Sequence, residues 1–393
     1  MPTRPCWAEI RTSALEANYR FLADIAAPHA ELLAIVKANA YGHSLDVCAP
    51  AVMRAGGRWL GVTSVEEGVA ARALCPEARV LVIGGVFAGQ GSAVILNKLT
   101  PVVWEPRQFD ELERAARAIG IRSLSVHLEI DTGMSRQGAD PDELSPLLSR
   151  FHRGSPLRLE SVMTHLFAAD EADELVTEAQ LARMDQALDR ISSAGLHAGY
   201  LNVGNSAALL ADQAATIAAL ASRYEMKTLI RPGLALYGLV PHYEPGFVGE
   251  EPSPLAEARR CLQPVMTWKS QVVSLRSIPA GAVVGYNGKF VATEPMRVAL
   301  VAIGYGDGLD RRLGSHFSLL VHGQRAPLVG RISMDQAVID VTEIENVAPG
   351  DDVVVLGSQG DETITAFDHA IAAETIPWEV FTRISQRVGR VEV

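Results

Sequence analysis

The sequence predicts an α/β fold, a closed (β/α)₈ TIM barrel followed by a C-terminal β-rich domain. Up to about Tyr243, short runs of β-branched and apolar residues alternate with amphipathic helical segments. No G-x-G-x-x-G follows any of these runs, which disfavours an open doubly wound sheet. Beyond Tyr243 helical periodicity nearly disappears, and short strands separated by turns replace it.

Eight strands are expected in the first part of the chain. They are Leu32–Lys37, Trp59–Thr63, Val80–Ile83, Thr100–Trp104, Leu124–Ile130, Leu157–His165, Tyr200–Val203 and Thr228–Ile230. Amphipathic segments lie between most of them, at Val65–Leu74, Pro106–Ile119, Pro141–Phe151 and Glu174–Ala194. Because a strand that is followed by a crossover helix pairs in parallel with the next strand, eight such units indicate a closed barrel.

The domain boundary is placed after residue 243, so that residues 1–243 form the barrel and residues 244–393 the β-rich domain. Turn-forming residues mark the connector, namely Pro245, Gly246, Gly249, Pro252 and Pro254. The strands expected beyond it are Val265–Leu275, Met296–Ile303, Ser318–Val321, Gln336–Val341 and Asp352–Leu356, and one helix is expected over Thr365–Glu374.

Composition limits the classes of function. A chain of 393 residues with 48% hydrophobic and 21% charged residues can bury the cores of a large and a smaller domain. The net charge of −11, with no compensating basic run, argues against nucleic acid as a partner.

The cysteines and the apolar segments point to the cytoplasm. Cys6, Cys48, Cys75 and Cys261 are scattered without a C-x-x-C pair, so neither a metal site nor a disulfide framework is expected. Residues 1–9 lack the apolar core of a signal peptide, and the apolar stretch 207–221 contains Asp212 and Gln213. We therefore expect no membrane partner.

Active sites of TIM barrels lie at the carboxyl ends of the strands, and the first expected strand ends at Lys37. A lysine that is shielded from water has a lowered pKa and can form a Schiff base with an aldehyde. A lysine that extends to water at the barrel rim is the alternative, and for Lys37 taken alone it is the favoured one.

The last two expected barrel strands run into turns suited to a phosphate. One continues into Gly204-Asn205-Ser206, and the other into Arg231-Pro232-Gly233. Backbone N–H groups and the Ser206 hydroxyl can hold a phosphate, and phosphate sites of such barrels often follow strands 7 and 8. An ordinary N-cap serine is as good an explanation of Ser206 alone, but the two turns support each other.

Several further polar residues have both a chemical and a structural explanation. Glu129 and Arg136 flank a turn and are suited to an ion pair, which is also a common structural salt bridge. His165 ends an expected strand, where a hydrogen-bonded core histidine is the alternative. Tyr286 and Tyr305 lie in glycine-rich turns of the second domain, and Met334-Asp335 lie in a third turn; aromatic residues in such turns are usually packing elements.

Taken together, these segments resemble the alanine racemase family. The specific segments are VKANAYGH at 36–43, DTGM at 131–134, RPGLALYG at 231–238 and GYGDG at 304–308. A related family of small PLP-binding (pyridoxal-phosphate-binding) barrel proteins shares the first segment but lacks the second domain. PLP decarboxylases with this barrel carry a cysteine motif in their second domain, and no such motif is found here.

The resemblance implies a cofactor site for PLP. Lys37 would bind the cofactor covalently, and the phosphate would be held by Tyr41, the turn of Asn205 and Ser206, and the backbone around Gly233 and Leu234. Arg231 would face the pyridine nitrogen, Arg136 the phenolic oxygen, and His165 would pack near the ring. Because Arg231 does not readily give up a proton, it would leave the pyridine nitrogen unprotonated and restrain transamination.

The resemblance also implies a two-base racemisation of L- and D-alanine. Lys37 and Tyr286 would act on opposite faces of the substrate, with Tyr286 supplied by the second subunit of a homodimer. The substrate carboxylate would be bound by Arg136, Tyr305 and the backbone of Met334, with Asp335 in support. The usual role in such a family is D-alanine supply for the cell wall.

Other functions remain open at this point. Racemisation of serine or of a broader set of amino acids is the alternative within the same class. A non-catalytic PLP-binding protein would need neither Tyr286 nor the second domain, and both are present. Decarboxylation lacks its expected cysteine.

Three residues depart from the family pattern. Glu129 stands where many members have a carbamylated lysine, so it is expected to supply the anion that orients Arg136 without carbon dioxide. Gln386 replaces a tyrosine that often contacts the phosphate. Asn202 replaces a histidine near the pyridine-side arginine, and its amide can still hydrogen-bond Arg231.

Overall fold

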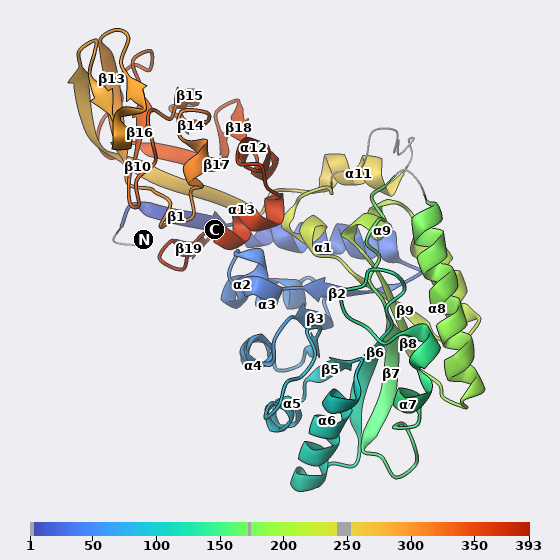
Figure 1. Ribbon diagram of the computed structural model, residues 1–393. Helices are drawn as coiled ribbons and strands as arrows, with labels where there is room; N and C mark the ends of the chain where they lie inside the picture. Colours follow the sequence, from blue (N-terminus) through green and yellow to red (C-terminus); the bar gives the residue numbers. More distant parts are fainter. Residues whose placement is uncertain (1–3, 172–173, 242–252) are drawn as a thin grey trace. The chain divides into compact units, whose positions relative to one another are not determined.

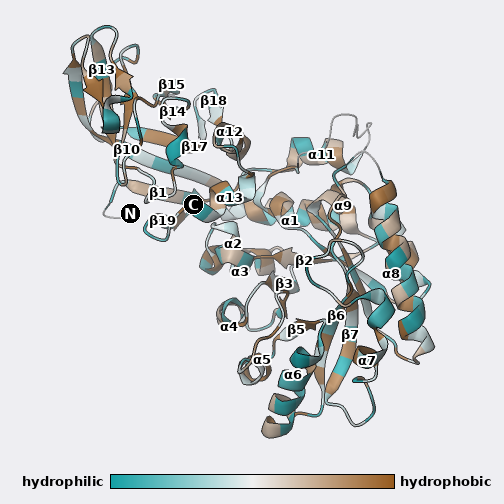
Figure 2. Cartoon of the chain, in the orientation of Figure 1, coloured by the Kyte–Doolittle hydropathy of each residue, from teal (hydrophilic) through white to brown (hydrophobic). Residues whose placement is uncertain are grey.

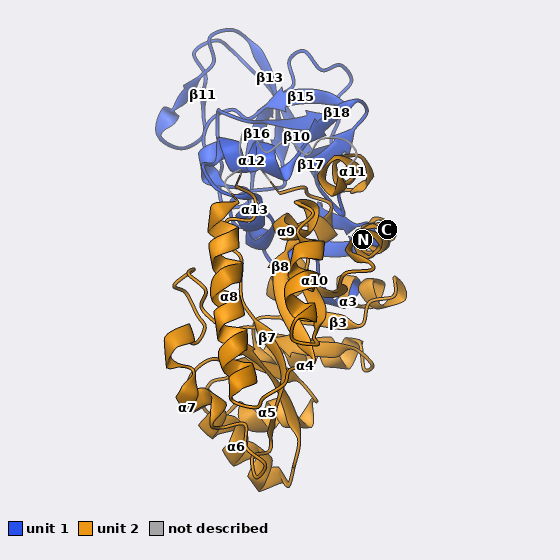
Figure 3. Cartoon of the chain, turned by 90° about the vertical axis from the view of Figure 1, so that its right-hand side faces the viewer, with its two compact units in different colours: residues 1–12, 41–47, 264–393 blue, residues 13–40, 48–263 orange. Residues whose placement is uncertain are grey.

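The computed structural model describes residues 4–171, 174–241 and 253–393 (Figure 1). The chain divides into two compact units, which Figure 3 colours separately. The barrel unit comprises Ser13–Ala40 and Cys48–Gln263, and the β unit comprises Met1–Thr12, Tyr41–Val47 and Pro264–Val393. The boundary expected after residue 243, and the connector residues up to Pro252, lie outside the described residues.

The barrel unit is built on eight parallel strands that close on themselves, as predicted. The strands are β2 (Glu31–Ile35), β3 (Trp59–Val62), β4 (Arg79–Val82), β5 (Thr100–Val103), β6 (Leu124–Glu129), β7 (Leu157–Met163), β8 (Tyr200–Asn205) and β9 (Lys227–Arg231). Closure is made by β2 and β9, where Glu31 is paired with Leu229. The strands are nearly continuous buried apolar runs because helices cover the outside of the barrel.

Helices connect the strands, and their ends follow from local sequence signals. The helices that precede β10 in the described residues are α1 (Thr12–Ala26), α2 (Lys37–Tyr41), α3 (Leu45–Arg54), α4 (Val65–Leu74), α5 (Gly91–Leu96), α6 (Pro106–Ile119), α7 (Ser145–Leu148), α8 (Leu175–Ser193), α9 (Ser206–Leu210), α10 (Ala214–Ser222) and α11 (Pro254–Cys261). Helix α6 begins with Pro106 and ends at Ile119, where it is capped by Gly120 with a left-handed φ of 83°. Figure 2 shows hydrophilic residues along α6, whereas its buried residues include Phe109, Leu112 and Ala116.

Helices α4 and α6 have the predicted bounds. The helix expected over residues 141–151 is instead a 3₁₀ turn, η1 (Pro141–Glu143), followed by the short helix α7. Pro141 and Pro146 lack the N–H group that a continuous helix would need, so the pattern of apolar residues alone overestimated the helix length.

The β unit contains a nine-stranded sheet. Its strands are β1 (Cys6–Ile10), β10 (Met266–Ile278), β13 (Met296–Val301), β14 (Ser318–Val321), β15 (Gln324–Pro327), β16 (Ala337–Asp340), β17 (Asp352–Gln359), β18 (Glu362–Ile364) and β19 (Gly389–Glu392). A separate hairpin joins β11 (Val283–Val284) to β12 (Phe290–Val291), and the helices are α12 (Ala366–Ala372) and α13 (Pro377–Arg383). The predicted β-rich second domain is thus confirmed.

One strand of this sheet comes from the start of the chain and was not predicted. Strand β1 pairs antiparallel with β10, with Trp7 opposite Lys269, and parallel with β19, with Trp7 opposite Gly389. Both ends of the chain therefore lie in the same sheet. Among the described residues, no helix combines the length and the apolar character needed to cross a membrane.

Candidate active site

Lys37 is separated from the end of β2 by Val36 alone and begins a turn of left-handed backbone. Ala38, Asn39 and Ala40 have φ of 52–55° and ψ of 49–52°, a conformation that costs an L-residue about 1–2 kcal/mol. The turn is held by the Ala40 N–H, which donates to Val36 O at 2.9 Å, and by the Ala38 N–H, which donates to Glu67 Oε1 at 2.7 Å. Backbone strain of this kind clusters at functional sites.

The Lys37 amine lies in a cationic environment. Burial lowers its pKa, Arg136 and Arg231 lower it further, and Glu67 acts in the opposite sense. A lowered pKa increases the fraction of neutral amine near pH 7, which is the form that acts as nucleophile and base. This result favours the chemical explanation of Lys37 over that of a solvated rim lysine.

Arg231, at the end of β9, is buried and donates hydrogen bonds through both Nη atoms. Its Nη1 donates to Asn202 O at 2.7 Å and to Asn202 Oδ1 at 2.5 Å, and its Nη2 donates to Thr164 O at 2.7 Å. Burial lowers its pKa to about 10, against the effect of Glu129, so Arg231 remains a cation at neutral pH. The expected contact between Asn202 and Arg231 is therefore present.

His165 accompanies Arg231 as a neutral ring. Its Nδ1 lies 3.3 Å from Arg231 Nη2. Burial, together with the charges of Arg231, Arg136 and Lys37, lowers the pKa of His165 to about 3. The ring is therefore uncharged at neutral pH, and Nδ1 can accept a hydrogen bond from the guanidinium.

Behind Arg231 a chain of polar side chains continues through the barrel core. Asn202 Nδ2 lies 3.4 Å from His127 Nδ1, and His127 Nε2 lies 3.4 Å from Glu160 Oε2. Arg79 Nη2 donates to Glu160 Oε1 at 2.5 Å. Burial lowers the pKa of His127, while Glu160 has a lowered pKa because its contacts with His127 and Arg79 outweigh burial. None of His127, Glu160 and Arg79 was predicted as a site residue, because each lies on a different strand.

Two turns meet at a hydroxyl, as expected for a phosphate site. Asn205 caps α9 by accepting from the Ala208 N–H at 3.0 Å, so the N-cap is Asn205 and not Ser206. The Ser206 Oγ accepts from the N–H groups of Gly233 and Ala235, at 2.9 and 3.2 Å. The ends of β8 and β9 thus place backbone donors and a hydroxyl together, and these groups fit a phosphate ester.

Glu129 ends β6 and is 2% exposed. Its Oε2 accepts from Gln137 Nε2 at 2.6 Å, and Gln137 Nε2 also lies 3.3 Å from Ile83 O. The expected ion pair with Arg136 is not found among the contacts of the described residues. Arg136 acts on Glu129 only through its charge. Burial raises the pKa of Glu129 to about 7, against the effects of Gln137, Arg231 and Arg136.

In the β unit, the turn of residues 330–335 contacts both tyrosine turns. Gly285, next to Tyr286, packs on the backbone of Arg331, so that an added Cβ would lie 3.0 Å from Arg331 N. The Tyr305 N–H donates to Ser333 O at 3.0 Å. Tyr286 begins the 3₁₀ turn η3 (Tyr286–Gly288) and is 64% exposed.

Met334 and Tyr41 are two further residues that the resemblance assigns to the site. Met334 is exposed, and within the described part of the chain its N–H has no acceptor. Tyr41 is buried, which raises its pKa to about 12 and keeps the phenol protonated as a hydrogen-bond donor. Gln386, the third departure from the family pattern, lies exposed between α13 and β19.

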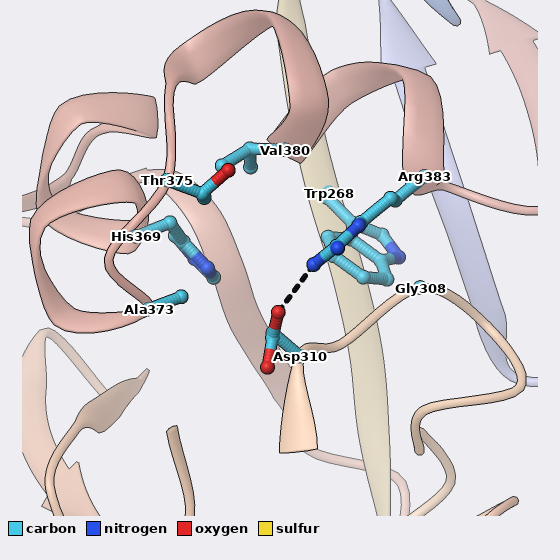
Figure 4. Close-up of a pocket in the computed structure, with 8 residues that line it drawn as sticks. All are labelled: Trp268, Gly308, Asp310, His369, Ala373, Thr375, Val380 and Arg383. Atoms are coloured by element: carbon cyan, nitrogen blue, oxygen red, sulfur yellow. Dashed lines mark hydrogen bonds and ion pairs between the residues drawn. The ribbon is translucent and has the colours of Figure 1, made fainter. Parts of the chain in front are cut away.

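A separate cavity lies within the β unit, between β10, α12 and α13 (Figure 4). It is lined by Trp268, Gly308, Asp310, His369, Ala373, Thr375, Val380 and Arg383. Arg383 pairs with Asp310, whose pKa is lowered to about 2 mainly by its hydrogen bond from Arg312. The cavity volume is about 10 Å³, close to the minimum for one water molecule, so this cavity is too small for a substrate.

A closed barrel that brings a lysine of lowered pKa, a buried arginine and a hydroxyl with backbone N–H groups to one rim is an arrangement suited to a pyridoxal-phosphate barrel enzyme. Sequence profiles of the alanine racemase N-terminal and C-terminal domains match residues 10–241 and 265–392. The chain therefore belongs to the alanine racemase family, a family of isomerases.

Individual relatives extend over the whole chain. An alanine racemase of Symbiobacterium thermophilum is 38% identical over 388 residues, 98% of this chain and 97% of the relative. The crystal structure of alanine racemase from D-cycloserine-producing Streptomyces lavendulae is 33% identical, has a TM-score of 0.87, and covers 100% of this chain and 98% of its own. Alanine racemase from Bartonella henselae, solved with covalently bound pyridoxal phosphate, is 29% identical with a TM-score of 0.81, covering 99% of each chain.

Proposed function

We propose that this chain interconverts L- and D-alanine, with pyridoxal phosphate as cofactor. The observation that carries the proposal is the convergence of Lys37, Arg231 and the Ser206–Gly233 contact at the carboxyl ends of β2, β8 and β9. The cofactor needs a lysine of lowered pKa for its aldehyde carbon, a partner for its pyridine nitrogen and hydrogen-bond donors for its phosphate.

The residues fit the cofactor as follows. Lys37 would hold its aldehyde carbon, the turn of Asn205 and Ser206 with Gly233 and Leu234 its phosphate, and Arg231 its pyridine nitrogen. Tyr41 would donate to the phosphate, Arg136 would neutralise the phenolic oxygen, and His165 would pack near the ring. When bound, the cofactor supplies a conjugated system that spreads the negative charge left by removal of the substrate α-proton.

Lys37 and Tyr286 would transfer the proton, one on each face of the substrate. A single base would return the proton to the face it came from, so inversion needs an acid opposite the base. The lowered pKa of Lys37 supports its role, since the Nζ atom must be neutral to accept a proton. Tyr286 Oη would deliver a proton to the other face and accept one in the reverse direction.

The substrate carboxylate would be bound by Arg136, the Tyr305 hydroxyl and the Met334 N–H, with Asp335 in support. The unsatisfied Met334 N–H in the β unit favours this assignment, because an exposed backbone donor is suited to a carboxylate oxygen. Glu129 would orient Arg136. The negative charge would come from the Glu129 side chain itself, so no carbon dioxide is needed. Loss of activity in Glu129→Gln, with no response of the wild type to removal of bicarbonate, would support that role.

Deuterium wash-in tests the reaction directly. The protein is loaded with pyridoxal phosphate and incubated in D₂O with L-alanine, with L-serine and with a basic amino acid, followed by proton NMR and chiral analysis. Loss of the alanine α-proton with formation of D-alanine supports the proposal, and the ranking of substrates distinguishes it from a serine or broad-specificity racemase. Binding of the cofactor without any exchange would favour a non-catalytic PLP-binding protein.

We further propose a homodimer in which Tyr286 of each subunit serves the site of its partner. The 64% exposure of Tyr286 supports this, since an exposed side chain is accessible to a partner subunit. Lys37→Ala and Tyr286→Phe, each inactive alone, are mixed and unfolded and refolded together. Random pairing should restore about a quarter of the wild-type activity, because half of the dimers would carry one intact site. No restoration would mean that both residues serve the same subunit.

A cytoplasmic location and a role in D-alanine supply for the cell wall complete the proposal. The four cysteines, all within the described residues, form no disulfide, as in proteins kept in a reducing compartment. Rescue of a bacterial strain that requires D-alanine, by expression of this chain, tests the cellular role.

A further inference from the structure

Asp307 is a completely buried carboxylate in the turn that carries Tyr305. Its Oδ2 accepts from the Gly304 N–H at 2.9 Å, and its backbone oxygen accepts from the Ser385 N–H at 2.9 Å. Isolated buried charges are costly, so this one must be compensated by its neighbours.

The compensation comes from two arginines at opposite ends of the chain. Arg4 donates through Nη1 to Asp307 Oδ1 and through Nη2 to Oδ2 at 2.9 Å. Arg387, just after α13, donates through Nε to Asp307 Oδ1 at 2.8 Å. Asp307 thus holds both guanidinium groups in fixed orientations.

The remaining donors of both arginines reach the turn of Met334. Arg387 Nη2 donates to Met334 O at 3.2 Å, and Arg387 Nη1 pairs with Asp335 Oδ1 at 2.8 Å. Arg4 Nη2 donates to Asp335 O at 3.0 Å. Two successive carbonyl groups, Met334 O and Asp335 O, therefore each accept from one of the two arginines, which holds the backbone directly after the Met334 N–H.

The two turns are also in direct contact. The Gly306 N–H donates to Met334 O at 2.8 Å. A Cβ added to Gly304 would lie 2.3 Å from Ser333 O and 2.4 Å from Met334 O, so only glycine allows this approach. The turn of residues 304–308 and the turn of residues 333–335 therefore form one rigid piece, which carries both Tyr305 and Met334.

We propose that Arg4, Asp307 and Arg387 are positioning residues for the substrate carboxylate, acting by fixing the Tyr305 hydroxyl and the Met334 N–H relative to each other. This inference rests on the proposed function, which assigns those two groups to the carboxylate. None of the three residues contacts the substrate. Two donors on separate turns bind one carboxylate well only when their spacing is fixed beforehand.

A role in folding alone does not account for the arrangement. Replacement of a buried ion pair by apolar residues of similar size is often neutral or stabilising, so packing alone does not require a charge at Asp307. Arg387 is 39% exposed at its side chain, yet it uses Nε, Nη1 and Nη2 on three different acceptors, two of them in the Met334 turn. A planar guanidinium can do this and a lysine ammonium cannot.

The test compares Arg387→Lys and Arg387→Ala with the control Arg383→Ala. The control removes an arginine of similar exposure that pairs with another aspartate of the β unit, Asp310 (Figure 4). For each cofactor-loaded enzyme, KM and kcat for alanine are measured, together with the inhibition constant of propionate, which carries the carboxylate but no amine. Thermal unfolding is recorded in parallel.

We expect Arg387→Ala to raise both KM and the propionate inhibition constant by about tenfold, the effect of losing one charge-assisted hydrogen bond. The kcat should change less than twofold, because the carboxylate is bound alike in the ground and transition states. Arg387→Lys should lie between the wild type and Arg387→Ala, because it keeps a positive charge beside Asp307 but loses the contacts with Met334 and Asp335.

Unchanged KM and propionate inhibition in Arg387→Lys, which keeps the charge and is the variant expected to fold, would overturn the proposal whatever the melting temperature does. An equal rise in Arg383→Ala would overturn it as well, since the effect would then be a general one. A wild-type enzyme that does not racemise alanine is a different result, which removes the proposed function itself.

Discussion

Arg231 donates through a single nitrogen, Nη1, to both the backbone oxygen and the side-chain oxygen of Asn202. The contact is buried, and Asn202 in turn approaches His127. Asn202 thus joins the guanidinium at the rim to the polar side chains of the barrel core.

Asn202→Ala should lower the free energy of unfolding by about 2 kcal/mol, because it removes a hydrogen bond to a buried charge. Chemical denaturation measures the loss. Asn97→Ala, which removes a side-chain amide that donates to Ala93 O at 2.9 Å on the surface side of the barrel unit, serves as the control and should cost about 1 kcal/mol or less. Equal losses in the two variants would show that the Arg231 contact contributes no more to the free energy of unfolding than a surface hydrogen bond does.

Arg231→Glu should increase transamination at the expense of racemisation. A carboxyl group can share a proton with the pyridine nitrogen, whereas Arg231 keeps its proton at neutral pH even with its pKa lowered to about 10. Pyruvate released from L-alanine measures the side reaction. If the ratio of pyruvate to racemised alanine does not rise, the role given to Arg231 is wrong.

Glu129→Gln should stabilise the cofactor-free protein at pH 8 but not at pH 4. The folded protein holds the pKa of Glu129 at about 7, above its ordinary value of 4.5, so the folded state favours the protonated form. Stability from this group is therefore present below pH 4.5 and is lost as the pH rises through 7. The loss amounts to about 3 kcal/mol at most, and a neutral glutamine avoids it.

Melting temperatures of the wild type and of Glu129→Gln, recorded between pH 4 and pH 8, provide the measurement. Glu160→Gln is the matched control, because the pKa of Glu160 is lowered and its removal should destabilise the protein at pH 8. A gain for Glu129→Gln that stays constant across the pH range would contradict the raised pKa.

The left-handed turn after Lys37 makes Ala38 sensitive to side-chain shape. Ala38→Val should lower the free energy of unfolding by about 2 kcal/mol, because a β-branched residue is disfavoured at positive φ. Ala38→Gly should change it by less than about 1 kcal/mol, since relief of strain offsets the entropy of the unfolded chain. Denaturation curves decide between this expectation and a backbone that tolerates both residues equally.

The barrel and its rim were predictable because their signals are local. Each buried parallel strand is a continuous apolar run, and Lys37, Ser206 and Arg231 stand where such runs end. The alternation of polar and apolar residues in α6, with a proline at its start and a glycine after its end, allowed both ends of the helix to be predicted correctly.

The features that were missed depend on partners far away in the sequence. Strand β1 leads into α1, while its partner strands β10 and β19 lie at the other end of the sequence, so no local signal marks it as part of that sheet. Gln137 takes the place expected for Arg136 beside Glu129, and a spacing of residues does not reveal which of two adjacent side chains turns inward. The left-handed turn is formed by Ala38, Asn39 and Ala40. Because none of them is a glycine, the sequence gives no indication of positive φ there.

The pairing of β1 with β10 and β19 has a consequence for protein synthesis. Glu9 in β1 and Lys269 in β10 are 260 residues apart in the chain, and β19 lies farther still. The ribosome makes β1 before the barrel and β10 after it, so this strand must stay unpaired while the whole barrel is translated. Until β10 has emerged, the backbone N–H and C=O groups of β1 are exposed to strand pairing with other nascent chains, so a chaperone that shelters β1 should increase the yield of soluble protein.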